Sequence, residues 1–259
     1  MKQHGIKFVG FTFLLTYLSH GALAILSQRG IIQLTDFLGQ VLFILGGSSP
    51  TIMAFVVVQL YYPKKEKEAF YQRLVNFKQP VRFYLFALMI PVALGWIFIL
   101  VALAFGNSLI GQVQSPLQYL FYFVPAILFG GLEEVGWRGI LQERFKQQNQ
   151  PLVLAVVIGL IWSLWHFPMF FVPDLNHSSY AVIPFIIQGI VFSLFLTYFY
   201  AKTNSIPLVV LLHTSINAAA SVGLRLAFEN QIYVYLYLLI AFILGVLLLK
   251  DATGRRNAG

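Results

Sequence analysis

Long apolar runs follow one another along this sequence from end to end, separated by short polar connections. A membrane-spanning helix takes about 20 predominantly apolar residues, and runs of this kind occur about eight times. None of them shows the alternation over about ten residues that marks a transmembrane β-strand. We therefore expect an all-α bundle with helices at roughly 8–28, 37–62, 82–105, 116–145, 151–172, 180–201, 206–224 and 232–250.

The composition leaves little room for anything outside the membrane. Hydrophobic residues make up 59% of the chain and charged residues only 10%, whereas globular domains have about half and about a quarter. The chain is therefore predicted to be one polytopic integral membrane domain over residues 1–259, with a lipid bilayer as its surroundings. It has no cysteine, which excludes thiolate catalysis and zinc sites built on cysteine.

The basic residues predict an orientation. Lys and Arg gather at the N-terminus, in alternate connections and in the tail, while the remaining connections hold only two of them. Positive loops face the cytoplasm, so we expect a multi-pass protein of the cell membrane with both termini cytoplasmic. The net charge of +8 is then explained by topology, and no nucleic-acid partner is expected. The apolar run after Lys7 continues past Ala24, which favours an uncleaved first helix over a signal peptide.

The longest polar stretch, residues 63–82, allows two interpretations. Phe70, Leu74, Phe77 and Val81 recur at helical spacing among basic residues, which fits an amphipathic helix on an anionic leaflet. A solvated basic loop that only fixes the topology fits the stretch equally well.

Three charges lie inside the predicted span 116–145. Each charge costs about 2.5–3.5 kcal/mol at mid-membrane on insertion scales, so Glu133, Glu134 and Arg138 must face protein or water. Glu134 and Arg138 are four residues apart and meet on one helix face, where they neutralise each other. Glu133 points about 100° away around the helix and is the carboxylate left free, which suits a general base. The glycines around them let neighbouring backbones approach closely.

Two histidines also lie inside predicted spans. They are His166 and His213, and Asn217 follows His213 by one helical turn. Intramembrane ionisable residues mark functional sites by default. With Glu133 they can activate a water and stabilise an oxyanion without a cofactor; alternatively, Glu133, His166 and His213 can hold a Zn²⁺ ion with an open position.

Taken together, these motifs resemble a known family. Glu-Glu-x-x-x-Arg at 133–138, aromatic-x-x-x-His at 162–166 and His-x-x-x-Asn at 213–217 occur in order on successive apolar segments, within the core 116–224. This pattern is similar to that of the CPBP intramembrane proteases. The family includes the CAAX prenyl endopeptidases of the Rce1 type and bacterial relatives linked to bacteriocin processing or immunity. Trp162 stands where phenylalanine is common in that family.

The resemblance implies an intramembrane endopeptidase that acts on a membrane-associated peptide or a prenylated protein. In that family pattern Glu133 activates water with help from His166, and His213 and Asn217 stabilise the oxyanion. Glu134 and Arg138 would be the supporting pair. The family has been described both as metalloproteases and as metal-free glutamate proteases, so the resemblance leaves the zinc question open.

Two other classes of function remain open from the sequence. A proton-coupled transporter would use Glu133 and His166 as a relay, although the inverted repeats typical of transporters are not recognisable. A non-catalytic immunity or binding protein would keep the fold and bind a peptide. Glu133 and His166 lie deep in long helices and His213 lies near the start of its own, which predicts a site in a cavity open to the cytoplasm.

Overall fold

The computed structural model describes residues 2–106, 109–110, 115–147, 150–173, 175, 181–224, 227–228 and 232–254. The regular elements among these residues are helices, apart from a two-residue antiparallel pairing of β1 (Leu109–Ile110) with β2 (Ala227–Phe228). The predicted all-α class is confirmed.

The helical elements run in chain order as follows: α1 (Lys2–Gln28), α2 (Phe37–Gly47), α3 (Ser49–Tyr61), α4 (Lys64–Leu74), α5 (Val81–Ala104), α6 (Pro116–Leu128), η1 (Gly131–Glu133), α7 (Glu134–Gly136), η2 (Trp137–Gln142), α8 (Glu143–Phe145), α9 (Pro151–Trp165), η3 (Phe167–Phe171), α10 (Val182–Thr203), α11 (Ile206–Ala219), η5 (Ala220–Leu224) and α12 (Ile232–Gly254).

Proline starts several of these helices. A proline stands in the first turn of α3, α6, α9 and α11, where its missing N–H would have no partner in any case. Ser115 and Ser205 cap α6 and α11 by accepting a backbone N–H from the first turn. The turn before α11 follows Asn204, which ends α10 with a left-handed backbone. The apolar segments 180–201 and 206–224 therefore fold as two separate helices.

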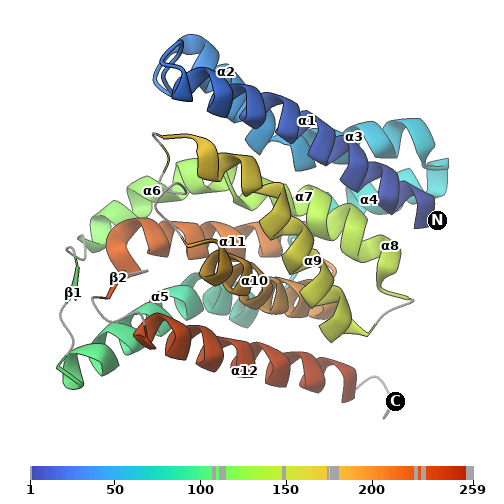
Figure 1. Cartoon of the computed structure of the whole chain (residues 1–259). Helices are drawn as coiled ribbons and strands as arrows, with labels where there is room; N and C mark the ends of the chain where they lie inside the picture. Colours follow the sequence, from blue (N-terminus) through green and yellow to red (C-terminus); the bar gives the residue numbers. More distant parts are fainter. Residues whose placement is uncertain are drawn as a thin grey trace.

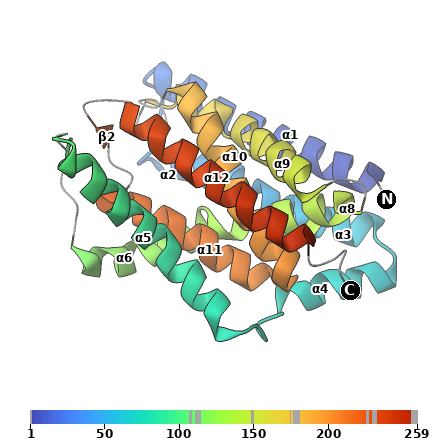
Figure 2. The same cartoon turned by 90° about the horizontal axis from the view of Figure 1, so that it is seen from below.

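The helices pack in three groups (Figure 1). The first helix, α1, packs on α2 and α3, and together they form one side of the molecule. In the middle, α11 packs on α5 and α6, and α10 packs on α9. The last helix, α12, lies across α10, as the view from below shows (Figure 2). The first helix begins and the last one ends at the same end of the molecule; which side of a membrane this end faces stays a prediction.

Four helical segments are long and apolar enough to cross a membrane: Gln3–Gln28, Leu117–Phe145, Pro151–Phe171 and Val182–Thr203. A fifth arises if α2 and α3, which meet at a 54° bend, are counted as one span. Three shorter apolar stretches complete the set: Val81–Ile97, Ile206–Val222 and Val234–Lys250. All the predicted apolar segments are thus helical, and the exact count of about eight spans stays a prediction.

The polar stretch 63–82 is a helix only in its first part. The helix α4 covers Lys64–Leu74, so the interpretation as a mere loop is wrong there. Its apolar side faces the bundle, because Phe70 is fully buried and packs edge-on against the ring of Phe55. Phe77 and Val81 lie beyond the helix and are 63% and 70% exposed. The expected continuous amphipathic face does not form.

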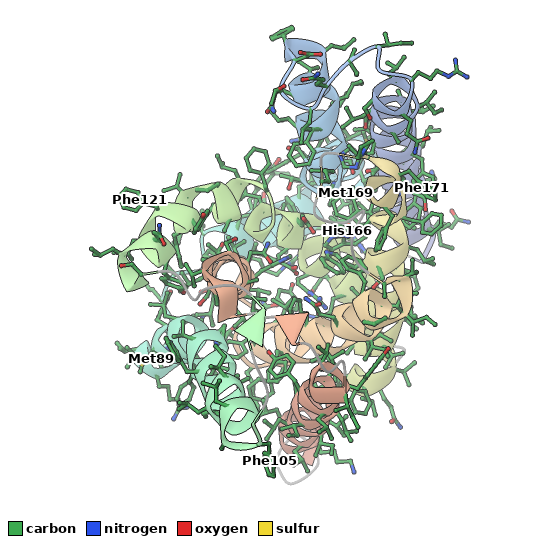
Figure 3. All side chains as sticks on the ribbon, turned by 60° about the vertical axis from the view of Figure 1, so that its left-hand side comes forward. Met89, Phe105, Phe121, His166, Met169 and Phe171 are labelled. Atoms are coloured by element: carbon green, nitrogen blue, oxygen red, sulfur yellow. The ribbon has the colours of Figure 1, made fainter. Side chains whose placement is uncertain are left out.

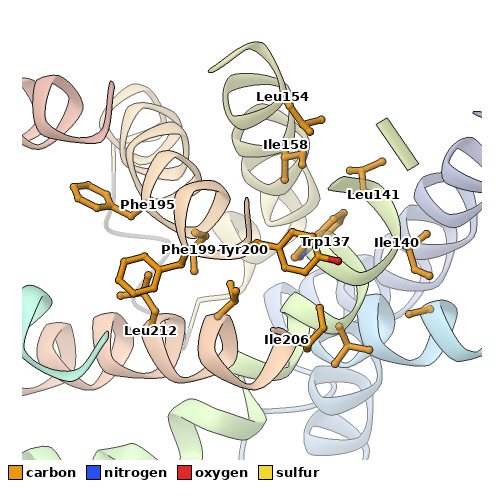
Figure 4. Close-up of a cluster of buried hydrophobic side chains, with 14 of the residues drawn as sticks. Trp137, Ile140, Leu141, Leu154, Ile158, Phe195, Phe199, Tyr200, Ile206 and Leu212 are labelled. Carbon is orange, nitrogen blue, oxygen red and sulfur yellow. The ribbon is translucent and has the colours of Figure 1, made fainter. Parts of the chain in front are cut away.

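The largest hydrophobic core lies where α9, α10, α11 and the η2 segment meet. Figure 4 shows Trp137, Ile158, Phe199, Tyr200 and Ile206 interleaved there, each of them buried. Close packing of this kind fixes the backbones of these four elements relative to one another. They are the elements that carry the polar residues inside the predicted spans.

Candidate active site

The segment predicted as one helix over 116–145 breaks at the candidate site. The helix α6 ends at Leu128, a 3₁₀ turn follows at η1, and the chain is wound as a π-helix over η2. The helix predicted over 116–145 is therefore present as the segment Leu117–Phe145, with changes of winding inside it that the sequence did not predict. Two neighbouring glycines, Gly130 and Gly131, stand at the break, and glycine is the residue that costs least to unwind. Helix irregularities of this kind are frequent at functional sites.

The same glycines bring the break against α11. A Cβ on Gly130 would overlap the amide nitrogen of Asn217, and one on Gly131 would overlap the hydroxyl of Thr214. On the other side of the segment, a Cβ on Gly136 would lie 2.6 Å from the carbonyl oxygen of Pro50 in α3. The expectation that these glycines permit close backbone approach is confirmed.

Both carboxylate oxygens of Glu134 are bound by cationic or ionisable groups. Arg138 donates from Nε to Oε2 at 2.8 Å, which confirms the predicted pair one turn apart. Oε1 lies 2.7 Å from Nδ1 of His213, which comes from α11. All three side chains are at least 97% buried. His213 is therefore held by Glu134, a contact that the sequence did not predict.

Arg138 has further partners on α10. Its Nη1 donates to Oγ1 of Thr197 at 2.9 Å, and its guanidinium also reaches Ser193 at 3.2 Å. A third contact joins Nη1 to Gln142 at 3.2 Å. A sequence signal for these partners existed: a guanidinium has five N–H donors, one carboxylate cannot satisfy them, and Ser193 and Thr197 lie four residues apart in an apolar helix.

Glu133 stands in a different environment. It is 95% buried, and within the described residues it has no ion-pair partner. Its Oε2 accepts a hydrogen bond from the indole N–H of Trp162 at 2.7 Å. The indole N–H of Trp137, one turn after Glu133, is also buried; it interacts with the Glu133 carboxylate but does not meet the geometry of a hydrogen bond among the described residues. Glu133 is thus a buried carboxylate held by an uncharged donor.

His166 lies beside Trp162 at the end of α9. Its Nδ1 is 2.9 Å from the carbonyl oxygen of Trp162, and the two ring centroids are 4.1 Å apart. A carbonyl oxygen only accepts hydrogen bonds, so Nδ1 carries a proton. Figure 3 labels His166 with Met169 and Phe171, which follow it on η3. The ring of Trp162 also meets that of His213, with centroids 6.2 Å apart.

The structure therefore gathers the predicted residues from three parts of the chain. The η1–α7 turn supplies the two glutamates, α9 supplies His166, and α11 supplies His213 together with Asn217, whose side chain lies against Gly130. The catalytic roles that the sequence analysis assigned to these residues stay predictions.

The zinc alternative finds no ready ligand group. Among the described residues no three His, Cys, Asp or Glu side chains converge as metal ligands. Nδ1 of each histidine is bound by an oxygen, which leaves Nε2 of each ring as the atom that could bind a metal, but these side chains do not converge on one point. The residues as placed do not fit a three-ligand zinc site, and no step proposed below runs through a metal.

Comparison with known proteins connects this geometry to a family. Residues 114–219 match the family described as Type II CAAX prenyl endopeptidase Rce1-like, and all six candidate residues fall in that range. This match supports the resemblance to the CPBP family that the sequence motifs suggested. The chain is also 28% identical over 191 residues to CAAX prenyl protease 2 of Methanococcus maripaludis, a match that covers 66% of the chain and 68% of the relative. Both similarities support a membrane-embedded peptidase.

Proposed function

We propose that this protein hydrolyses a peptide bond of a prenylated or otherwise membrane-associated substrate, using a water molecule that Glu133 activates. The observation that carries the proposal is the contrast between the two adjacent carboxylates. Glu134 has both oxygens bound, by Arg138 and His213. Glu133 is also buried, but among the described residues only one of its oxygens is bound, by a neutral donor. It is the carboxylate able to accept a proton.

The reaction then follows the chemistry of a general base. Glu133 removes a proton from water while the water oxygen attacks the scissile carbonyl carbon. The carbonyl π-electrons move to oxygen and give a tetrahedral oxyanion. When the oxyanion collapses, the C–N bond breaks and the proton held by Glu133 passes to the leaving nitrogen. One water is consumed, and a new carboxyl and a new amine are released.

His213 and Asn217 stabilise the negative charge that develops on the oxyanion, and His166 relays protons. Because Glu134 holds Nδ1 of His213, the other ring nitrogen is the one that turns to the substrate. Asn217, one turn later, offers its amide N–H from the same helix face. His166 carries its Nδ1 proton toward a backbone carbonyl, so its Nε2 accepts and relays protons beside Glu133.

A lipid-modified substrate is supported by two observations. The curated relative is named a CAAX prenyl protease, and apolar side chains are exposed at the C-terminal end of α6 and on η3. They are Leu128, Phe129, Phe167 and Phe171, each at least 40% exposed. Such side chains suit an apolar substrate that reaches the site from the bilayer. We place the site toward the cytoplasmic side, following the charge distribution of the loops.

The test uses Glu133→Gln, which keeps the shape and removes the base. Purified protein in proteoliposomes is given a peptide that ends in a farnesylated cysteine motif and, separately, the same peptide without the lipid. Removing a general base is expected to lower the cleavage rate by about 10²–10⁴-fold, with the amount of folded protein unchanged.

The matched control is Glu68→Gln, which changes an exposed glutamate of α4 and is expected to leave the rate unchanged. Wild-type cleavage by Glu133→Gln would overturn the proposed mechanism. If the wild-type protein cleaves the farnesylated and the unmodified peptide equally fast, the preference for a prenylated substrate is overturned. If the wild type cleaves neither peptide, the termini of membrane peptides are compared between cells that carry the wild type and cells that carry Glu133→Gln. A terminus that depends on Glu133 identifies the substrate, and the absence of any such terminus overturns the protease assignment.

A further inference from the structure

Trp162 contacts three of the candidate catalytic residues at once. Its indole N–H donates to Oε2 of Glu133 at 2.7 Å, and its backbone carbonyl accepts from Nδ1 of His166 at 2.9 Å. Its ring lies 4.1 Å from the ring of His166 and 6.2 Å from that of His213, measured between centroids. Among the described residues, Trp162 supplies the hydrogen bond that holds Glu133.

Packing alone does not require this N–H. The ring of Trp162 stacks on Phe185 with centroids 5.5 Å apart and planes 13° from parallel, a contact that any aromatic ring can make. A phenylalanine ring could make the same contact, and it cannot donate a hydrogen bond. The N–H is therefore a feature of this chain beyond the aromatic character of the position.

The carboxylate has a physical need for such a donor. Burying a charge without a partner is costly in free energy. A cation would neutralise the charge of Glu133, as Arg138 neutralises that of Glu134, and would make Glu133 a weaker base. A neutral indole N–H satisfies one oxygen and leaves the charge on the group. It also fixes the side-chain torsions, because a carboxylate bound at one oxygen can no longer rotate freely.

We propose that Trp162 is a positioning residue for Glu133, and this inference rests on the proposed function. Its indole N–H holds Oε2, so that Oε1 faces the water that is deprotonated. Through its carbonyl, the same residue sets the tautomer and the ring direction of His166. Trp162 thereby places base and relay relative to each other from one turn of α9.

The chain contains a matched control on the same helix. Trp165 lies three residues later and is 99% buried. Its indole N–H donates to Oγ1 of Thr16 at 2.5 Å and to Oγ of Ser49 at 3.2 Å, hence toward α1 and α3 instead of Glu133. The substitution Trp165→Phe removes the same chemical group from the same helix without touching the base.

The experiment compares Trp162→Phe with Trp165→Phe in proteoliposomes. A hydrogen bond to a charged group is expected to change kcat by about 10- to 100-fold when it is lost, so Trp162→Phe lowers kcat by that factor with KM within about twofold. Trp165→Phe leaves kcat unchanged and lowers only the Tm. An unchanged kcat in Trp162→Phe, or an equal loss in both variants, overturns the inference.

A second measurement does not depend on activity. The indole N–H resonance of Trp162, assigned by ¹⁵N-tryptophan labelling of the wild type and the Phe variants, is expected to shift when Glu133→Ala removes its acceptor. The Trp165 resonance stays in place. A Trp162 resonance that does not respond overturns the inference even if Trp162→Phe fails to fold. Full activity of Glu133→Gln would instead overturn the proposed function, so the two failures are distinguishable.

Discussion

Two buried polar clusters flank the helix α9, and they are built on opposite principles. We call Glu133, Glu134, Arg138 and His213 the charged cluster, which Trp162 contacts. We call Thr16, Ser49 and Trp165 the hydroxyl cluster, in which Thr16 lies 2.5 Å from Ser49 and accepts from Trp165. Both lie in the protein interior, and each receives an indole N–H from α9.

The two clusters differ in charge and in how completely their polar atoms are hydrogen-bonded. The hydroxyl cluster is neutral and closed: Thr16 also donates to the carbonyl oxygen of Gly46, and the result ties α1 to α3 and α9. In the charged cluster both oxygens of Glu134 are bound, whereas one oxygen of Glu133 accepts no hydrogen bond from the described residues. Two tryptophans within one turn of α9 thus differ in the group that accepts their indole N–H: a carboxylate for Trp162 and a hydroxyl for Trp165.

The largest effect on stability is expected from Arg138→Met. This change leaves Glu134 without its guanidinium in a site that is 99% buried, and breaking a buried ion pair costs about 3–5 kcal/mol. We expect a strong fall in Tm in detergent micelles. The double variant Arg138→Met/Glu134→Gln removes both charges and is expected to recover much of the loss. If single and double variants unfold alike, the cluster is not held together by charge.

A smaller effect is expected from Thr16→Val in the hydroxyl cluster. The substitution keeps the shape but removes the hydroxyl that accepts from Trp165 and donates to Gly46. Net hydrogen bonds of this neutral kind contribute about 1 kcal/mol each, so the Tm falls by less than in Arg138→Met. The cleavage rate per folded molecule stays at the wild-type value. A fall in kcat would show that the two clusters are not separate.

The smallest effect is expected from Glu66→Gln, which removes the ion pair between Arg144 and the partly exposed Glu66. Exposed pairs contribute about 0–1 kcal/mol, and Arg144 keeps a second partner in the hydroxyl of Tyr62 at 2.6 Å. Tm and kcat should both lie within error of the wild type. A loss as large as that of Arg138→Met would mean that burial does not set the rank order.

Hydropathy and spacing predicted the helical elements and one important contact. The apolar runs became helices because a helix satisfies its own backbone hydrogen bonds in apolar surroundings, and the pair of Glu134 with Arg138 follows from helical geometry alone. The break at Gly130 was missed because hydropathy averaged over a span does not register a local change of winding. Helical spacing cannot place two helices relative to each other, so the bond of His213 to Glu134 could not be foreseen.

Trp162 was missed for a related reason. In a sequence, an indole within an apolar run counts as a hydrophobic residue, and its N–H matters only once an acceptor lies beside it. The acceptor, Glu133, comes from another segment. Single residues whose polar atom depends on a distant partner are thus the part of a membrane site that sequence patterns predict least well.

The one-turn spacing of Glu134 and Arg138 has a consequence for how the protein is made. The chain is synthesised from its N-terminus, so the span that carries this pair leaves the ribosome before His213 and the hydroxyls of α10 exist. A lone charge at the helix centre costs about 2.5–3.5 kcal/mol on insertion. Because the pair lies on a single turn, the segment carries its own counter-ion into the bilayer, and the later helices add their bonds to a charge that is already neutralised.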